Sequence, residues 1–344
     1  MKRTQIAVDV AKSVFELAVS TRPGRVDRRQ RVTRQQFPVA LGVEPGAEVI
    51  MEACGSAHHW GRTLHAKGHP VTLLHPGDVA RYRDGNKTDR ADAKALLEAV
   101  RNDALDPVPV KSPEQQGLWA LHRIRAAYLR TRTARINELR GHLREFGCII
   151  PLGARHVGPA AAAALASEAV PAFVRPALQA LLDDVGELAT KADGIRQAIE
   201  QLATAMPAAQ LLLTIPGIGM LTATALVAAI GTPHRFRSGR DCAAYFGLTP
   251  REHSSGSGRR LGAITKRGNS YVRMLLVHGA RSALRAGAVS RCPDDLRVWA
   301  QAVAARKGHN VAVVALANKL ARVCWLVWRD ERPFERREVV ASVS

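Results

Sequence analysis

Residues 5–33 read QIAVDVAKSVFELAVSTRPGRVDRRQRVT, three short β-prone runs separated by turn residues. Two further runs, EVIMEA from residue 48 and VTLLHP from residue 71, flank a helix-like stretch over residues 58–68. Three strands in succession, followed by strand, helix and strand, are typical of an α/β layer with the element order of an RNase H-like sheet.

Helical spacing dominates the rest of the chain. It begins with TDRADAKALLEAV at residues 88–100 and continues through a long amphipathic helix over 114–146, which Pro151 and Gly153 are expected to end. After an Ala-rich stretch, residues 176–205 resume the pattern, and the two long segments are expected to pair as an antiparallel coiled coil. The predicted fold class is therefore α/β followed by α.

Chain length and element order together predict the domain boundaries. The chain has 344 residues, enough for about two domains of ordinary size, or for one domain with a long insertion. The expected parts are an α/β catalytic domain at 1–112, a helical coiled-coil segment at 113–206 and a mainly helical domain at 207–344.

The composition favours a polyanionic partner inside the cell. Lys and Arg number 50 against 30 Asp and Glu, a net charge of +20 carried in several separate blocks, which indicates nucleic acid rather than a membrane surface. The five cysteines form no C-x-x-C pair, and neither a signal peptide nor a transmembrane helix is expected. A cytoplasmic protein without a membrane partner is predicted.

Four carboxylates in the first hundred residues form a candidate metal site. Asp9 and Glu52 close apolar strands, and Asp89 and Asp92 stand at i and i+3 on one helix face. Four hard oxygen donors suit Mg²⁺, and two such ions about 4 Å apart could clamp the oxygens of a phosphoryl transfer. The alternative treats Asp89 as a helix N-terminal charge and Asp9 as a turn residue.

Three basic or glycine-rich regions are candidate nucleic-acid contacts. The PGIG turn in LLTIPGIGM is typical of a helix-hairpin-helix facing a phosphate, or alternatively of a plain core corner. The first long helix carries Arg with few acids, and the loop HSSGSGRRLGAITKRGN combines Ser, Gly and cations. That loop either holds phosphates around a serine nucleophile or is a solvated Gly/Ser loop. The predicted contacts are Arg123, Arg130, Arg135, Gly217, Gly219, Arg259, Arg260, Lys266 and Arg267.

The chain resembles the DEDD-type transposases of the insertion sequence 110 family over nearly its whole length. The resemblance lies in the order and spacing of five segments: IAVDVAK, VIMEACG, GNKTDRADA, PGIG and FGLTPREHSSGSGRRLGAITKRGN. The resemblance implies a RuvC-like RNase H fold with a coiled-coil insertion and a C-terminal transposase domain carrying a serine. It places the Mg²⁺-binding catalytic tetrad on Asp9, Glu52, Asp89 and Asp92. The nucleophile aligns best with Ser255, with Ser254 as the alternative.

The same resemblance implies how such a recombinase works. Its members are guided by a noncoding RNA of the element, which pairs with donor and target DNA, and the acids of one protomer meet the serine of another in an oligomer, expected to be a tetramer. The predicted function is therefore an RNA-guided transposase that cuts and rejoins DNA. The alternatives are a metal-dependent nuclease of Holliday-junction-resolvase type and an inactive nucleic-acid-binding relative.

Overall fold

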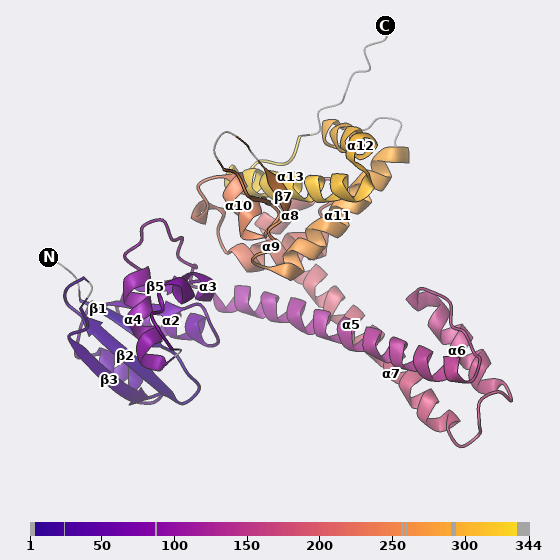
Figure 1. Ribbon diagram of the computed structural model, residues 1–344, viewed down its shortest axis with the longest axis horizontal. Helices are drawn as coiled ribbons and strands as arrows, with labels where there is room; N and C mark the ends of the chain where they lie inside the picture. Colours follow the sequence, from indigo (N-terminus) through magenta and orange to yellow (C-terminus); the bar gives the residue numbers. More distant parts are fainter. Residues whose placement is uncertain are drawn as a thin grey trace, which may run out of the picture. The chain divides into compact units, whose positions relative to one another are not determined.

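A computed structural model describes residues 4–23, 25–86, 88–255, 258, 260–289 and 294–335 of the chain. The chain divides into two compact units, each with its own clusters of buried apolar side chains (Figure 1). Unit 1 comprises the chain up to Glu114 together with Gly231–Arg237. Unit 2 comprises Gln115–Ile230 together with the chain from Ser238 onward.

Unit 1 is built on a mixed sheet with helices on both faces. Its described elements are β1 (Gln5–Asp9), β2 (Val14–Ser20), β3 (Arg28–Thr33), α1 (Phe37–Leu41), β4 (Glu48–Glu52), α2 (Ala57–His65), β5 (Val71–Leu74), α3 (Pro76–Val79), η1 (Ala80–Tyr82), α4 (Asp89–Ala99) and η3 (Pro233–Arg235). The strand order is β3-β2-β1-β4-β5, with β1 antiparallel to β2 and parallel to β4. This sheet is consistent with an RNase H-like fold, and the five strands predicted from the sequence are all present.

Alternation along the strands sends two sets of side chains to opposite faces of the sheet. Large residues on one face pack under α1 and α2, where Phe15, Phe37 and Trp60 meet edge to face. The other face carries the small residues Ala7 and Ala18, which pack against α4. Because these side chains are short, α4 can pack close to the strands.

Unit 2 is almost entirely helical in the residues described. Its elements are α5 (Pro113–Glu145), η2 (Ala154–His156), α6 (Val157–Ala166), α7 (Arg175–Thr204), α8 (Pro207–Leu213), α9 (Met220–Ile230), α10 (Gly239–Tyr245), β6 (Pro250–Glu252), β7 (Leu261–Ile264), α11 (Ser270–Val289), α12 (Asp295–Lys307) and α13 (His309–Arg329). The long helices α5 and α7 agree with the sequence prediction to within one residue at each end, whereas α6 was not predicted.

The two long helices form an antiparallel hairpin. Near the start of α5, Leu118 shares an apolar cluster with Ile199 near the end of α7, and farther along Arg135 pairs with Asp184. The remainder of α5 packs against α6 and the start of α7. Antiparallel pairing thus agrees with the prediction, and supercoiling of the pair remains a prediction.

The first long helix ends within one residue of the predicted position, but a different residue ends it. It stops at Glu145, and Gly147 follows with φ +77°. The amide of Cys148 donates to the carbonyl of Leu143 at 2.9 Å, which closes the helix as a Schellman cap. Gly147, rather than the predicted Pro151 and Gly153, therefore ends the helix.

Helix α13 forms the centre of the C-terminal part of unit 2. Among the described residues it is the one helix long and apolar enough to cross a membrane, but 56% of that window is buried inside the fold. It packs against α8, α10, α11 and α12, as expected of a core helix.

A buried histidine links α5, α9 and α11. The His122 side chain is fully buried, and its ring nitrogens lie 3.1 Å from Tyr271 Oη and 3.0 Å from Thr224 Oγ1. Because the Thr224 hydroxyl donates to the carbonyl of Met220 at 2.7 Å, it accepts from His122 Nε2, which leaves Nδ1 to accept from Tyr271. The network therefore uses a neutral imidazole.

We expect His122→Asn to reduce the pH dependence of the stability of unit 2. Burial, followed by the charge of Arg125, lowers the pKa of His122 from 6.5 to about 4. Between these values the unfolded chain binds a proton that the folded chain does not, so the free energy of unfolding falls as the pH falls. The loss from this group is roughly 2 kcal/mol between pH 7 and 5. The prediction is tested by the urea unfolding midpoints of wild type and His122→Asn at pH 7 and 5. Equal loss of stability in the two proteins between these pH values would contradict the prediction.

Candidate active site

Two acids lie side by side at the carboxyl ends of β1 and β4. Val8 pairs with Met51 in parallel register, so the next residues, Asp9 and Glu52, end the two strands at the same level. Lateral neighbours in a sheet point to the same face. The residues two positions before each acid pack against α4. Both carboxylates therefore belong to the face that α4 covers, which we call the acid face.

The pKa of the Cys54 thiol indicates that both carboxylates lie near the same sulfur atom. Burial, and after it the charges of Glu52 and Asp9, raises the pKa of this thiol. Both acids are therefore within electrostatic reach of a single sulfur atom. The structure thus brings together two of the four predicted tetrad residues, although they are far apart in the sequence.

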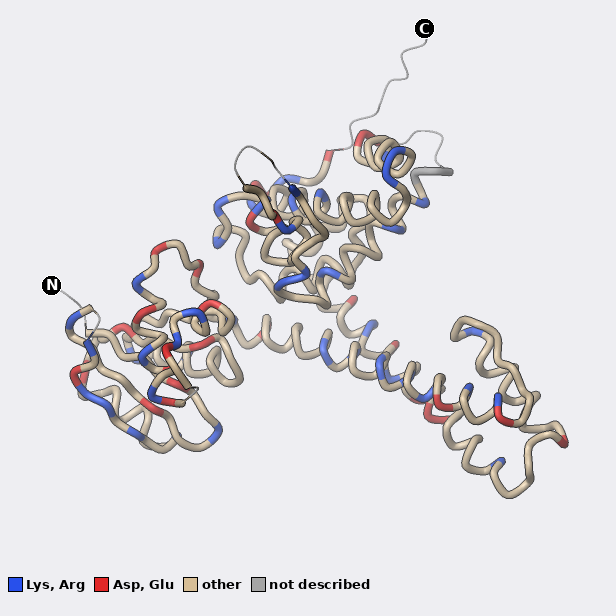
Figure 2. Tube along the Cα trace, viewed as in Figure 1, with Lys and Arg blue, Asp and Glu red and all other residues tan. Residues whose placement is uncertain are grey.

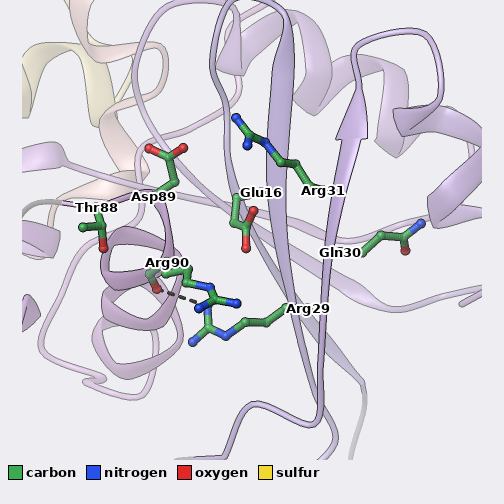
Figure 3. Close-up of a pocket in the computed structure, with 7 residues that line it drawn as sticks. All are labelled: Glu16, Arg29, Gln30, Arg31, Thr88, Asp89 and Arg90. Atoms are coloured by element: carbon green, nitrogen blue, oxygen red, sulfur yellow. Dashed lines mark hydrogen bonds between the residues drawn. The ribbon is translucent and has the colours of Figure 1, made fainter.

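The other two predicted acids belong to the first turn of α4. Thr88 caps this helix by accepting from the amide of Ala91 at 3.2 Å, which places Asp89 at the first helical position. Asp92 is buried, and its carboxylate accepts a hydrogen bond from Nε of Arg83. Asp89 is exposed and lines an open pocket against β2 and β3 (Figure 3). The two acids of α4 therefore have different surroundings.

The donor chemistry of the acid face fits Mg²⁺, which prefers carboxylate oxygens. In the described part of the chain, however, no three His, Cys, Asp or Glu side chains gather into one coordination group. Asp9 and Glu52 are the pair that could hold an ion. Asp92 would have to exchange its contact with Arg83 to join them.

Sequence reasoning missed two residues of the same cross-strand row. Asp9 pairs with Glu16 on β2, and Glu16 in turn pairs with Arg31 on β3. The row across the acid face therefore runs Arg31, Glu16, Asp9 and Glu52. The available signal was a single acid inside the apolar run VFELAVS, but only the pairing register shows that it faces Asp9.

Ser254 and Ser255 of the predicted loop lie just beyond β6, in a two-stranded hairpin of unit 2. Strands β6 and β7 pair antiparallel, and their described residues are exposed except for the half-buried Ile264. Ser255 pairs with Gly258 in an isolated bridge beyond the strands. The serine is thus held on an exposed hairpin.

The two candidate serines have different hydrogen bonds. The hydroxyl of Ser254 donates to Glu252 Oε1 at 2.7 Å and accepts from the amide of Arg260 at 3.2 Å. These bonds tie Ser254 to both sides of the hairpin. Ser255 is exposed at the tip, and its described contacts are made by its backbone. The structure therefore gives Ser254 a structural task that it does not give Ser255.

Glycines fix the base of this hairpin against α10. Gly247 has φ +66°, and a Cβ there would lie 2.2 Å from the carbonyl oxygen of Arg267. Gly268 has φ +72°, and its Cβ would lie 2.0 Å from the carbonyl oxygen of Tyr245. Arg273 adds hydrogen bonds to the carbonyls of Phe246 at 2.8 Å and Arg267 at 2.9 Å. Close backbone packing thus sets the position of the serine hairpin on unit 2.

The predicted basic contacts of the hairpin differ in how far the structure describes them. Arg260, Lys266 and Arg267 are exposed, and Lys266 has φ +56°. Arg259 lies outside the described residues. Arg260 belongs to the serine hairpin, and Lys266 and Arg267 follow its second strand. Their contact with nucleic acid stays a prediction.

The PGIG turn joins α8 to α9. Gly217 has φ +87°, and a Cβ there would lie 2.7 Å from the carbonyl oxygen of Gly279 on α11. Helix packing is therefore sufficient reason for this glycine. Gly219 is exposed, with open space beside it, just before the start of α9. Of the two glycines, Gly219 is the one whose surroundings leave room for a phosphate.

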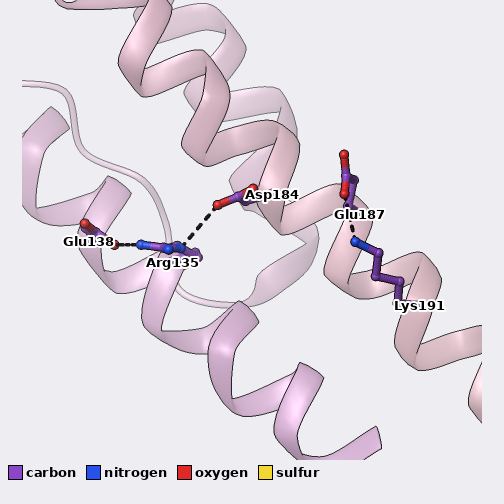
Figure 4. Close-up of polar contacts among 5 residues, drawn as sticks. All are labelled: Arg135, Glu138, Asp184, Glu187 and Lys191. Carbon is purple, nitrogen blue, oxygen red and sulfur yellow. Dashed lines mark hydrogen bonds and ion pairs between the residues drawn. The ribbon is translucent and has the colours of Figure 1, made fainter. Parts of the chain in front are cut away.

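Arginines recur along α5 (Figure 2), and the contacts of their side chains differ. Arg135 is paired with Glu138 at 2.8 Å and with Asp184 at 3.3 Å (Figure 4). Arg123 and Arg130 are exposed. The charge of Arg135 is already balanced within the hairpin, so Arg123 and Arg130 are the better placed of the three for a phosphate.

Comparison with known proteins covers most of the chain. Residues 209–292 match a family described as "Transposase IS116/IS110/IS902 family", and residues 6–147 match the DEDD family of IS110, described as "Transposase". A probable family 20 transposase of Pseudomonas aeruginosa is 40% identical over 96% of this chain and 98% of its own length. The transposase for insertion sequence element IS1111A of Coxiella burnetii is 40% identical over 95% and 90%. The pilin gene-inverting protein of Moraxella lacunata is 25% identical over 98% and 99%.

Proposed function

The chain belongs to the IS110 family of transposases, which cleave and rejoin DNA, and on this basis we propose that it is an RNA-guided recombinase that uses a serine nucleophile. The observation that supports the chemistry best is the side-by-side placement of Asp9 and Glu52 on the acid face. The serine hairpin belongs to the other compact unit.

In the proposed reaction, Ser255 Oγ attacks a phosphorus atom of the DNA backbone. The serine–phosphorus bond forms as the bond to the 3′ oxygen breaks, the hydroxyl loses its proton, and the leaving oxygen gains one. The product is a 5′-phosphoserine linkage. The 3′ hydroxyl of another strand reverses the step and releases the serine, so rejoining needs no energy source.

Carboxylates at the strand ends would hold the metal. Mg²⁺ bound there would supply charge stabilisation at the phosphoryl group. Asp9 and Glu52 would form the pair that holds the ion, and Asp89 and Asp92 would come from α4. Asp92 contacts Arg83 in the structure, and it would leave that contact to join the metal.

The proposed partners follow from the basic surfaces and from the family resemblance. An element-encoded noncoding RNA would select donor and target DNA by base pairing, while Arg123, Arg130 and the cations of the serine hairpin hold backbones. We place the protein in the cytoplasm as a homo-oligomer, proposed to be a tetramer, in which the acids of one protomer act with the serine of another. The name of the Moraxella relative, which inverts a pilin gene, agrees with a recombinase.

A covalent adduct between protein and DNA tests the proposal. With cognate DNA, element RNA and Mg²⁺, wild type should form an adduct that survives a denaturing gel. Ser255→Ala should abolish the adduct, because it removes the attacking oxygen. Ser254→Ala is the matched control, and it should retain the adduct at a reduced level because it loses the bonds to Glu252 and Arg260.

The other outcomes distinguish the alternatives. Loss of the adduct in Ser254→Ala but not in Ser255→Ala would identify Ser254 as the nucleophile. Cleavage without an adduct, surviving both changes, would support a metal-dependent nuclease. Metal-independent binding without cleavage would support an inactive relative.

A further inference from the structure

We propose that Arg29, Arg31 and Arg90 form a binding site for a backbone phosphate of the DNA strand, beside the acid face. This inference rests on the proposed function, because it identifies the acid face as the place where DNA is cut. It concerns how the strand is positioned and leaves the identity of the nucleophile open.

The edge strand β3 presents arginines to the same face as the acids. Arg31 pairs with Glu16 and Arg29 pairs with Ala18, and Ala18 packs toward α4. Lateral neighbours share a face, so both arginines point to the side of α4 rather than to that of α1 and α2. Arginines at these positions of an edge strand are poorly suited to burial. They are well suited to binding a polyanion.

A pocket lies between this edge and the start of α4. It has a volume of about 440 Å³ and is lined by Glu16, Arg29, Gln30, Arg31, Thr88, Asp89 and Arg90. Figure 3 shows arginines from β3 and from α4 on its two sides. Nη1 of Arg29 donates to the carbonyl of Arg90 at 3.2 Å, which fixes this side chain while using one of its five donors.

The pocket fits a phosphodiester because its three arginines outnumber its two carboxylates, Glu16 and Asp89. Guanidinium groups bind phosphate oxygens through paired hydrogen bonds, and here they come from two separate elements. Asp9 lies two strands from Arg31 in the same row, a spacing of about 10 Å. Arginine side chains can reach across part of that spacing, so the bound phosphate would lie within one or two nucleotides of the cleaved one.

The test compares binding, without cleavage, of DNA carrying single neutral phosphates. Duplex of the element end, each copy carrying one methylphosphonate, is titrated with the full-length protein and element RNA in the absence of divalent metal. Combining Arg29→Gln, Arg31→Gln and Arg90→Gln should lower affinity for unmodified DNA roughly tenfold and reduce the salt slope by about 1. At one or two positions near the cleavage site, a methylphosphonate should lower the affinity of wild type for DNA by the same factor of about ten. At those positions it should leave the affinity of the triple variant unchanged.

Arg28→Gln is the matched control, because Arg28 belongs to the same strand but pairs with Val19 on the opposite face and contacts Glu44 at 3.3 Å. Its affinity should stay within about twofold of wild type. Circular dichroism confirms that each variant is folded.

Two results would overturn the proposal. One is a scan in which every methylphosphonate weakens wild type and the triple variant by the same factor. The other is an equal loss of affinity for element RNA alone, which would make the pocket an RNA contact. Since no strand is cut in this assay, its result is independent of whether Ser255 forms an adduct.

Discussion

Asp9→Asn is expected to lower strand cleavage by on the order of 10³-fold or more while leaving the fold intact. The substitution keeps the size of the side chain and removes the charge that, together with Glu52, would hold Mg²⁺ at the ends of β1 and β4. Losing about 4 kcal/mol of transition-state stabilisation corresponds to that factor. Cleavage is measured on cognate DNA in single-turnover reactions, with circular dichroism to confirm folding.

Strand β4 offers a matched pair for the same experiment. Glu52→Gln should be as damaging as Asp9→Asn, whereas Glu48→Gln should keep activity within a few-fold of wild type. Glu48 faces the same side but begins the strand, about 13 Å from Glu52, and accepts from Gln5 at 3.0 Å and Thr72 at 2.8 Å. Equal activity of the two glutamine variants would refute the metal role of the acid face.

Gly268→Ala should destabilise unit 2 by about 3 kcal/mol or more and abolish adduct formation. A side chain here is strained at φ +72°, and its Cβ would collide with the carbonyl oxygen of Tyr245 at 2.0 Å. Either the end of α10 or the turn before α11 must then shift, and the serine hairpin moves with it. Urea unfolding measures the stability, and the denaturing gel measures the adduct.

Gly262→Ala separates this effect from a general intolerance of the hairpin to larger residues. Gly262 belongs to β7, where a Cβ would meet its nearest neighbours at 3.8 Å, an ordinary contact. We expect its stability to change by less than about 1 kcal/mol. If both variants matched wild type, close packing at the base of the hairpin would not be what positions the serine.

Local patterns predicted the strands of unit 1 and the two long helices of unit 2, whereas residues 207–344 were predicted only as mainly helical, without the β6–β7 hairpin. Alternating apolar residues predicted the five strands, and helical spacing predicted α4, α5 and α7 nearly to the residue. Short elements escaped prediction because three to five residues carry too little periodicity, as in α1 and α3. The Ala-rich α6 escaped because its pattern has little polar contrast.

The tetrad positions followed from motif resemblance, and the structure adds how those residues are supported. The sequence shows that Asp9 and Glu52 end strands, but the parallel register places them side by side and adds Glu16 and Arg31 to their row. The sequence likewise does not show that Asp92 contacts Arg83, nine positions earlier in the chain.

Secondary structure and local charge depend on residues that are close together in the sequence. Periodicity, turn glycines and blocks of basic residues therefore predicted many elements of this chain and its preference for a polyanionic partner. Partners across a sheet or between helices depend on register and packing among distant residues, and a shift of one residue in a strand would reverse every face. The cross-strand row, the His122 network and the contact of Gly217 with Gly279 therefore required the folded structure.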